Sequence, residues 1–253
     1  MEIMKRKGCN TADRHLLKII NKNTSIRIIG ENMQKTGLLI TFEGLDFSGK
    51  STQLELFYKY LLNQGIAAKI FREPGGTPLA EEIRTLLLHK KEYVMSKETE
   101  FSLFLAARSD LYANAILPLV EQGTFCLTDR CGDSSTAYQG FGRNYGDKKE
   151  VEYILESNKK AMHGKQIDIT YFVDVPVSIA MARKQEKINV GKSPDRMESN
   201  NNEFFERTRE GYLWLSKREE RFSVIDGTKS IEEVHKMIIN DYHATIQSKI
   251  LKV

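Results

Sequence analysis

The sequence predicts an α/β fold in which a five-stranded parallel sheet is flanked by helices. Three observations support this prediction: short apolar segments alternate with segments of helical spacing, charged residues follow several of the apolar segments, and a glycine-rich turn with a lysine joins the first strand to the first helix. Strands that alternate with helices favour βαβ crossovers, which produce a parallel sheet covered on both faces.

Five apolar segments of strand length are expected to form the sheet. They are Leu38–Phe42, Ala67–Phe71, Thr124–Thr128, Ile169–Val173 and Phe222–Ile225. In an open parallel sheet, ligands bind at the carboxyl ends of the strands. The polar residues that follow these strands are therefore candidate site residues: Asp46, Arg72, Asp129 and Arg130.

Segments of helical spacing follow the strands. The first helix is expected to begin near Lys50, with Leu54, Phe57 and Leu61 on one face and Gly65 at its C-terminal cap. Its proline and glycine content makes REPGGTP, the segment from Arg72 to Pro78, a loop. Further helices are predicted at Leu79–Leu88, from about Thr99 to about Val120, at Lys148–Met162 and at Ile231–Ile239, and the charged stretch after Asp174 is helix-rich.

The first 36 residues read differently from the rest. They are basic, polar and weakly periodic, so we expect an N-terminal extension at 1–36 of uncertain structure and one functional domain at 37–253. Two interpretations are open. The extension is a tail or a short helix around Leu16–Ile20, or the functional domain begins at Met33 and the preceding residues are dispensable.

Composition narrows the class of protein. The formal net charge of +4 does not by itself argue for a nucleic-acid partner, and we expect none. No run approaches the ~18 apolar residues that a membrane helix needs, and the N-terminus lacks the apolar region of a secretory signal, so no membrane association is expected. The cysteines, Cys9, Cys126 and Cys131, form no CxxC pair, which favours a reducing, cytoplasmic setting and argues against structural zinc.

The segment GLDFSGKST at 44–52 is the strongest functional motif, because it matches GxxxxGK[ST] between a strand and a helix. Its glycines allow backbone N–H groups to surround phosphate oxygens, and the helix N-terminus adds partial positive charge. Lys50 supplies a cation for the β- and γ-phosphates, and the Ser51 hydroxyl suits Mg²⁺. The predicted ATP contacts are Gly44, Leu45, Asp46, Phe47, Ser48, Gly49, Lys50, Ser51 and Thr52.

Two classes of phosphate-binding protein compete for this motif. The apolar segment FCLTD, Phe125–Asp129, suits a metal-binding strand, and Asp129–Gly132 also matches the DxxG feature of GTPase switches. Guanine recognition usually uses NKxD, however, and the NK pairs at Asn21 and Asn158 lack the aspartate. A kinase with a phosphorylated acceptor needs arginines for the acceptor phosphate and for the transferring group, and no catalytic histidine. The sequence favours the kinase.

The long helix carries an arginine on its apolar stripe. Phe101, Phe104, Leu105 and Arg108 follow i, i+3, i+4 and i+7 spacing. Arginine is rarely buried without a partner. Arg108 therefore either extends to solvent along its own stem or faces a ligand, with a phenylalanine ring available to stack on a base.

Five segments together resemble the thymidylate kinase family: FEGLDFSGKST, REPGGT, SLFLAARSDL, TDRCGDSSTAYQG and DRMESNNNEFFERTREGY. The resemblance covers about Leu38–Ile239 and excludes residues 1 to about 36. It implies a P-loop fold of the nucleoside monophosphate kinase type with a lid at about 183–200. It also implies phosphorylation of dTMP to dTDP with ATP and Mg²⁺, a cytoplasmic location and a homodimer.

The resemblance assigns roles on the acceptor side. Arg72 would lie near the acceptor phosphate with Glu73 beside it, Phe104 would stack on thymine and Arg108 would reach the base edge. Arg130 would bind the dTMP phosphate. The residues implied to line the nucleoside are Ser134, Ser135, Tyr138 and Gln139, with Tyr138 against the sugar edge where a 2′-hydroxyl would sit.

It also assigns the catalytic and metal residues. Ser51, Asp129 and Asp46 would organise Mg²⁺, and Arg183 and Arg196 would be the lid cations. The implied catalytic set is Lys50, Asp46, Arg130, Arg183 and Arg196.

Three features depart from the family pattern. The P-loop carries Phe47 where some members have arginine, so the catalytic charge should come from the lid, as in the bacterial-type members. Cys131 stands where an aromatic residue or histidine is common, and the lid is longer and richer in lysine. The alternatives are another monophosphate kinase that also accepts dUMP, since one methyl group contributes only ~1 kcal/mol, and a nucleotide-binding module without activity.

Overall fold

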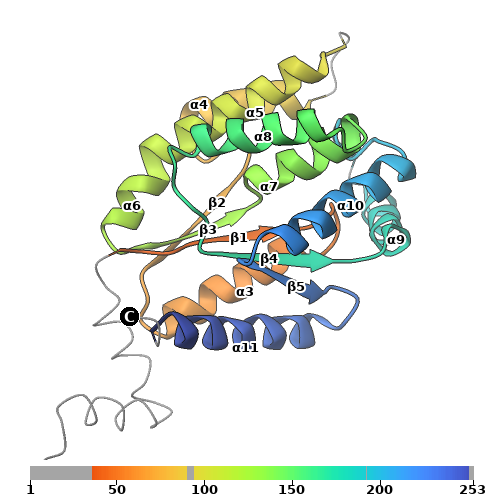
Figure 1. Ribbon diagram of the computed structural model, residues 1–253. Coiled ribbons are helices and arrows are strands. Elements are labelled where there is room, and N and C mark those ends of the chain that lie inside the picture. The colour runs from red at the N-terminus through yellow and green to blue at the C-terminus, as the bar shows by residue number, and fades with distance from the viewer. Residues whose placement is uncertain (1–35, 90–93, 192, 251–253) are drawn as a thin grey trace, which may run out of the picture.

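A central sheet lies between two helical layers in the computed structural model, which describes residues 36–89, 94–191 and 193–250 (Figure 1). The interpretations of the N-terminal extension, including a helix around Leu16–Ile20 and a start at Met33, concern residues outside the described part of the chain.

The sheet has the predicted five parallel strands, in the order β2-β3-β1-β4-β5. Their bounds are β1 Leu39–Glu43, β2 Ala68–Arg72, β3 Phe125–Asp129, β4 Ile169–Asp174 and β5 Phe222–Asp226. Each strand ends one residue later than predicted, on a charged residue. The prediction stopped at the last apolar residue, whereas backbone pairing continues through the next one, as between Arg72 and Asp129.

Helices α3 (Lys50–Asn63) and α11 (Ile231–Ile250) cover one face of the sheet (Figure 1). Ile40 and Phe42 of β1 point into this layer because side chains alternate along a strand. The prediction ended α11 at Ile239, which was too early. Its apolar stripe continues at four-residue spacing through Tyr242 and Ile246, both buried in the same core.

The opposite face carries the remaining helices of the described residues, several of which contribute side chains to the pocket. They are α4 (Pro78–Leu88), α5 (Lys97–Leu111), α6 (Leu117–Glu121), α7 (Gly132–Ser135), α8 (Lys148–Ala161), α9 (Val177–Asn189) and α10 (Asn202–Arg218), with the π-helical segments η1 (Tyr112–Ile116) and η2 (Thr136–Arg143). Leu39 and Glu43 of β1 point to this face. The carboxyl end of β1 thus brings a buried carboxylate beneath the pocket.

The predicted helix from about Thr99 to about Val120 is one helix, Lys97–Glu121, with a π-helical turn at η1. The turn precedes Pro118, whose ring and missing N–H disrupt regular α-helical bonding. By length and composition this helix could span a membrane. It nevertheless carries the ion-paired side chains of Glu100 and Arg108, and its residues Leu111 and Ile116 pack against the sheet.

The segment after β3 is helical although no helix was predicted there. It contains α7 and η2, which include Gly132, Gly140 and Gly142. Close packing explains why position 142 is a glycine, because a Cβ at Gly142 would lie 2.6 Å from the Phe204 ring of α10. The glycine allows η2 and α10 to pack closely over the sheet.

Candidate active site

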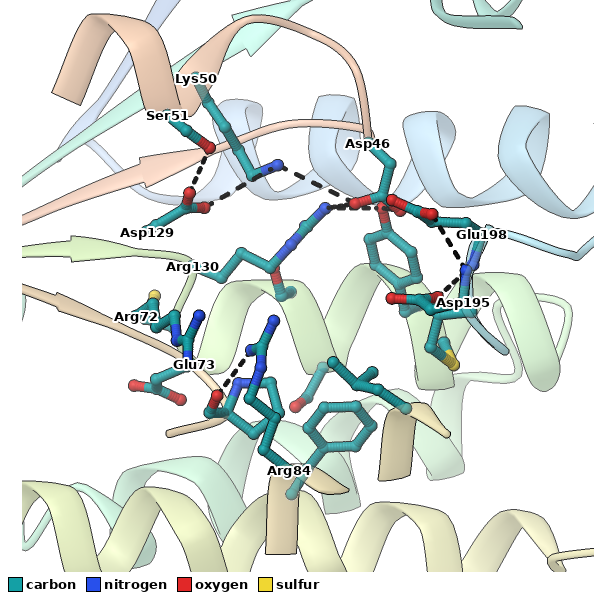
Figure 2. Close-up of a pocket in the computed structure, with 18 of the residues that line it drawn as sticks. Asp46, Lys50, Ser51, Arg72, Glu73, Arg84, Asp129, Arg130, Asp195 and Glu198 are labelled. Carbon is teal, nitrogen blue, oxygen red and sulfur yellow. Dashed lines mark hydrogen bonds and ion pairs between the residues drawn. The ribbon is translucent and has the colours of Figure 1, made fainter. Parts of the chain in front are cut away.

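A cavity of about 240 Å³ opens at the carboxyl ends of β1, β2 and β3. Most of the predicted site residues line it (Figure 2): Asp46, Phe47, Lys50, Ser51, Arg72, Glu73, Phe104, Arg108, Asp129, Arg130, Ser134, Ser135, Tyr138 and Gln139. The lining does not include Gly44, Leu45, Ser48, Gly49, Thr52, Arg183 and Arg196. The structure therefore brings together residues from segments almost a hundred positions apart.

The glycine-rich turn needs its glycines for steric reasons. Gly49 caps α3 at φ 97°, in the left-handed region that glycine adopts easily. Gly44 has φ 143°, and a Cβ there would lie 2.5 Å from the Val173 carbonyl oxygen. Phe47 also adopts a left-handed conformation, at φ 66°, which is unusual for a bulky residue. The Lys187 ammonium lies 5.0 Å from the centre of the Phe47 ring.

Lys50, Ser51 and Asp129 meet at the start of α3 (Figure 2). The Ser51 hydroxyl donates to Asp129, and the Lys50 ammonium lies 3.8 Å from Asp129 and 4.0 Å from Asp46. Burial and nearby Arg130 lower the pKa of Lys50, while both carboxylates act in the opposite direction. A hydroxyl and a carboxylate side by side at the pocket suit a hard divalent cation, so the residues present fit a metal of that kind.

Arg130 is the most extensively bonded cation in the cavity wall. The backbone of Arg130 has a left-handed φ of 72°, and its guanidinium carbon lies 4.9 Å from the centre of the Tyr138 ring. The guanidinium donates hydrogen bonds of 2.5 to 3.1 Å to Gly44 O, Ser134 Oγ, Tyr212 OH, Asp46 Oδ1 and Tyr138 OH. Burial alone would raise the pKa of Asp46, but Arg130 and Lys50 lower it below its usual value. Asp46 is therefore ionised and held against Arg130.

Arg108 does not reach solvent, so that interpretation of its place on the apolar stripe is wrong. Arg108 is only 2% exposed, and its guanidinium donates to Glu73 Oε2 at 2.7 Å and to Ser135 Oγ at 3.1 Å. It also donates to Asn158 Oδ1 at 2.7 Å and to the Cys131 carbonyl at 3.2 Å. Burial raises the pKa of Glu73 to about 7 despite this pairing.

Two further arginines lie on the α4 side of the cavity. Arg72 is exposed and pairs with Glu81 at 2.8 Å. Arg84 was missed by the sequence reasoning, although it lines the cavity and donates to Pro74 O at 2.7 Å. The signal was available: Arg84 follows Ala80 by four residues and lies on the same helical stripe as the buried Leu87. This is the pattern that pointed to Arg108.

The lid arginines lie outside the cavity wall in this conformation. Arg183 donates to Ser48 O and Gly227 O, both at 3.0 Å. Arg196 donates to Leu87 O at 2.6 Å and to Glu100 at 2.5 Å. Their predicted catalytic roles stay predictions.

Four other lid residues line the cavity and were not predicted: Lys187, Asp195, Met197 and Glu198. Asp195 and Glu198 bind each other's backbone N–H groups at 2.8 and 3.1 Å, as Figure 2 shows. Asp195 and Glu198 lie in the segment DRMESNNNEFFERTREGY, from which only Arg196 was singled out as a site residue, and Lys187 lies in a charged stretch that no motif marked.

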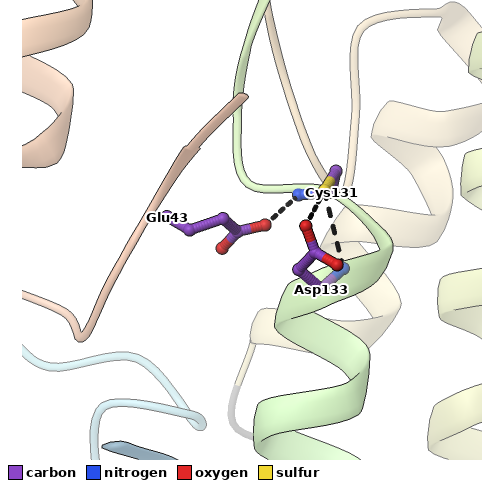
Figure 3. A group of neighbouring side chains, drawn as sticks. All are labelled: Glu43, Cys131 and Asp133. Atoms are coloured by element: carbon purple, nitrogen blue, oxygen red, sulfur yellow. Dashed lines mark hydrogen bonds between the residues drawn. The ribbon is translucent and has the colours of Figure 1, made fainter. Parts of the chain in front are cut away.

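A group of potential metal ligands lies beside the cavity, whose lining includes its member Cys131: Glu43, Cys131 and Asp133 (Figure 3). Its members are already satisfied by protein partners. Glu43 accepts from Cys131 N at 2.8 Å, and Asp133 pairs bidentately with Arg221 at 2.7 Å. Burial raises the pKa of Cys131 well above its usual value, and its thiol donates to Asp133 Oδ2 at 3.4 Å. Cys131 thus packs in the core beside the acceptor side of the cavity.

The parallel sheet, the glycine-rich turn with Lys50 and Ser51, and the arginine-lined cavity define a P-loop protein of the nucleoside monophosphate kinase class. Residues 42–238 match the family model described as thymidylate kinase. The chain belongs to the thymidylate kinase family.

Individual relatives agree with the family model. The chain is 46% identical over 201 residues to a thymidylate kinase of Thermosipho melanesiensis, and the aligned part is 79% of this chain and 95% of that protein. It is 39% identical over 206 residues to one of Kosmotoga olearia, with 81% and 95% covered. It is 42% identical over 211 residues to one of Thermosipho africanus, with 83% and 100% covered.

Proposed function

We propose that the protein transfers the γ-phosphoryl group of ATP to the phosphate of dTMP, forming ADP and dTDP. The observation that carries the proposal is the composition of one cavity. Its lining combines Lys50 and Ser51, which follow the glycine-rich turn, with three arginines, Arg72, Arg84 and Arg130. Phe104, Arg108 and Gln139 line the same cavity. Family membership favours the same acceptor.

On the donor side, backbone N–H groups of the turn and the N-terminus of α3 bind the triphosphate. Lys50 contacts the β- and γ-phosphates. Ser51, Asp129 and Asp46 are the residues that would hold Mg²⁺, with phosphate oxygens and water as further ligands. When bound, the ion would neutralise phosphate charge, and the ionised carboxylate of Asp46 would offer it an anionic oxygen.

On the acceptor side, Arg84 and Arg130 hold the dTMP phosphate and Arg72 lies near its entrance. Arg84 donates a single hydrogen bond among the described residues, to Pro74 O, whereas Arg130 donates five, so Arg84 retains N–H donors for a phosphate. Phe104 stacks on the base, and Tyr138 limits space at the sugar. Ser135, whose oxygen accepts from Arg108, is left with its hydroxyl hydrogen to donate to a base carbonyl.

The lid supplies the remaining positive charge. Lys187 lines the cavity next to Phe47, whereas Arg183 and Arg196 are bonded elsewhere in this conformation. We therefore propose Lys187 as the lid cation nearest to the transferring group. Closure of the lid excludes water, which would otherwise compete as acceptor.

The protein acts as a homodimer in the cytoplasm in this proposal. Leu79 and Leu86 of α4 are exposed one above the other, although such residues are usually buried, and only 33% of the most apolar part of the adjoining helix Lys97–Glu121 is buried. Light scattering tests the dimer: a monomeric mass at micromolar concentration would contradict it.

ADP production from Mg·ATP with a panel of acceptors tests the activity. The panel contains dTMP, dUMP, dCMP, UMP, AMP and GMP, and Lys50→Ala serves as the control. We expect strong turnover with dTMP, weaker turnover with the others, and a folded control with little turnover. Activity with a different monophosphate would mean that the acceptor side is wrongly assigned. Turnover by Lys50→Ala would contradict the assignment of the phosphate-binding turn.

A further inference from the structure

Glu100 lies in the first turn of α5, behind the cavity wall, and is 2% exposed. Its carboxylate accepts from Gln139 Nε2 at 2.9 Å through Oε1 and from Arg196 Nη1 at 2.5 Å through Oε2. Arg143 donates to both oxygens at 3.3 Å. One buried carboxylate therefore connects a residue of the cavity lining with two arginines.

The surroundings keep Glu100 ionised. Burial alone would raise its pKa, but Arg143, Gln139 and Arg196 lower it below the usual value. An ionised carboxylate only accepts hydrogen bonds. Gln139 must therefore turn its NH₂ group toward Glu100, which places its carbonyl oxygen on the other edge of the amide.

The carbonyl oxygen of Gln139 matters for recognition of the acceptor base, because Gln139 lines the cavity. Thymine and uracil carry an N–H at position 3, whereas cytosine has an acceptor nitrogen there. We propose that Glu100 is a positioning residue that fixes the Gln139 amide with its carbonyl oxygen toward the acceptor base, and so selects bases that carry an N–H at that edge. This inference rests on the proposed function.

The same carboxylate anchors the lid. Arg196 belongs to the lid and also donates to Leu87 O at the end of α4. Arg143 ends η2 and also donates to Asn200 of the lid at 2.8 Å. The polarity of Gln139 and the position of the lid segment thus depend on one side chain, which couples recognition of the base to lid placement.

The substitution Glu100→Gln tests the proposal with little change of shape. The two arginines would occupy the single amide oxygen of the new residue, and its NH₂ group would face Gln139. The Gln139 amide then has to invert and present its NH₂ group to the base. We expect the ratio of kcat/KM for dTMP over dCMP to fall by about tenfold or more.

A swap of the two side chains provides the rescue. In the double variant Glu100→Gln with Gln139→Glu, the carboxylate at 139 accepts from the amide at 100, and its second oxygen again faces the base as an acceptor. The double variant also retains the negative charge beside both arginines. We expect the dTMP preference to return. Glu98→Gln, which removes an exposed carboxylate from the same helical turn, is the matched control and should leave the ratio unchanged.

A purely structural role predicts a different result, because it would lower kcat/KM for both acceptors equally. An unchanged ratio in Glu100→Gln, or a swap variant as unselective as that single variant, would overturn the proposal. If circular dichroism shows that Glu100→Gln does not fold, the charge-preserving swap variant decides alone: wild-type selectivity supports the proposal and lost selectivity overturns it. A wild-type protein without dTMP turnover would instead contradict the proposed function.

Discussion

Arginines of similar appearance in the sequence have different positions in the site. Arg130 donates five hydrogen bonds and holds the ionised Asp46 beside the turn, whereas Arg84 donates one, to Pro74 O, among the described residues. The two should therefore respond differently to truncation, because only Arg130 is ion-paired with a carboxylate. Its removal would leave the partly buried Asp46 with Tyr138 OH and the more distant Lys50 ammonium as partners.

We expect Arg84→Ala to raise KM for dTMP by about 10- to 100-fold with little change in Tm, because a charged hydrogen bond contributes about 1.5–3 kcal/mol. Arg130→Ala should damage dTMP use as well and also lower Tm. Steady-state kinetics and thermal unfolding of both variants make the comparison. An Arg84→Ala enzyme with unchanged KM for dTMP would remove Arg84 from the acceptor site.

Much of the site could be predicted residue by residue, because the P-loop is a local motif with a fixed geometry. The partners of Arg196 could not be predicted. Its carboxylate, Glu100, lies 96 positions away, and only the packing of the lid on α5 brings them together. Arg84 was predictable by the argument used for Arg108, but that argument was applied to one helix only.

At the scale of elements, the sheet was predictable and the helical details were not. Every strand is a short apolar run, which the sequence displays directly. The π-helical turn at η1 and the helices α7 and η2 depend on close packing against neighbouring elements, so periodicity alone does not reveal them. Helix α9, which carries the lid cation Lys187 to the phosphate-binding turn, lies in the stretch after Asp174 that was predicted to be helix-rich, but its bounds were not predicted.

Lys187→Ala should lower kcat by about 100-fold while KM for dTMP changes little, because the lost charge acts on the transferring group. Lys187→Arg should retain most of the activity. Lys160→Ala, which removes an exposed charge from α8, is the matched control. If kcat of Lys187→Ala equals that of the control, the catalytic charge comes from another residue, and Arg183 would be examined next.

At the scale of the whole molecule, the buried Glu73 makes stability depend on pH. Its pKa of about 7 in the folded protein exceeds the ordinary value of 4.5, because burial outweighs Arg108. Protons are then bound more tightly by the folded state. The stabilisation is fully present below about pH 4.5 and is lost as pH rises through about 7.

The variant Glu73→Gln isolates this contribution. We expect the Tm of the wild-type protein, relative to that of Glu73→Gln, to fall between pH 5 and pH 7 and to level off above pH 8. Calorimetry across that range measures both values. A difference that does not vary with pH would mean that Glu73 is ionised throughout and held as such by Arg108.

Residues 1–32 should be dispensable for the fold and the reaction, because β1 begins at Leu39 and the family match begins at residue 42. A protein without these residues should keep its Tm and its kcat with dTMP. Loss of either would assign the extension a role in the domain.

Helix α11 leaves the carboxyl end of β5 and runs back along the sheet for 20 residues, about 30 Å (Figure 1). It therefore ends near the amino end of β1, whereas the cavity lies at the carboxyl ends of the strands. For protein engineering, this means that an affinity tag, a fluorescent fusion or a surface linker can be attached beyond α11 without approaching the substrates. An enzyme immobilised through this end would present its open cavity to the solution.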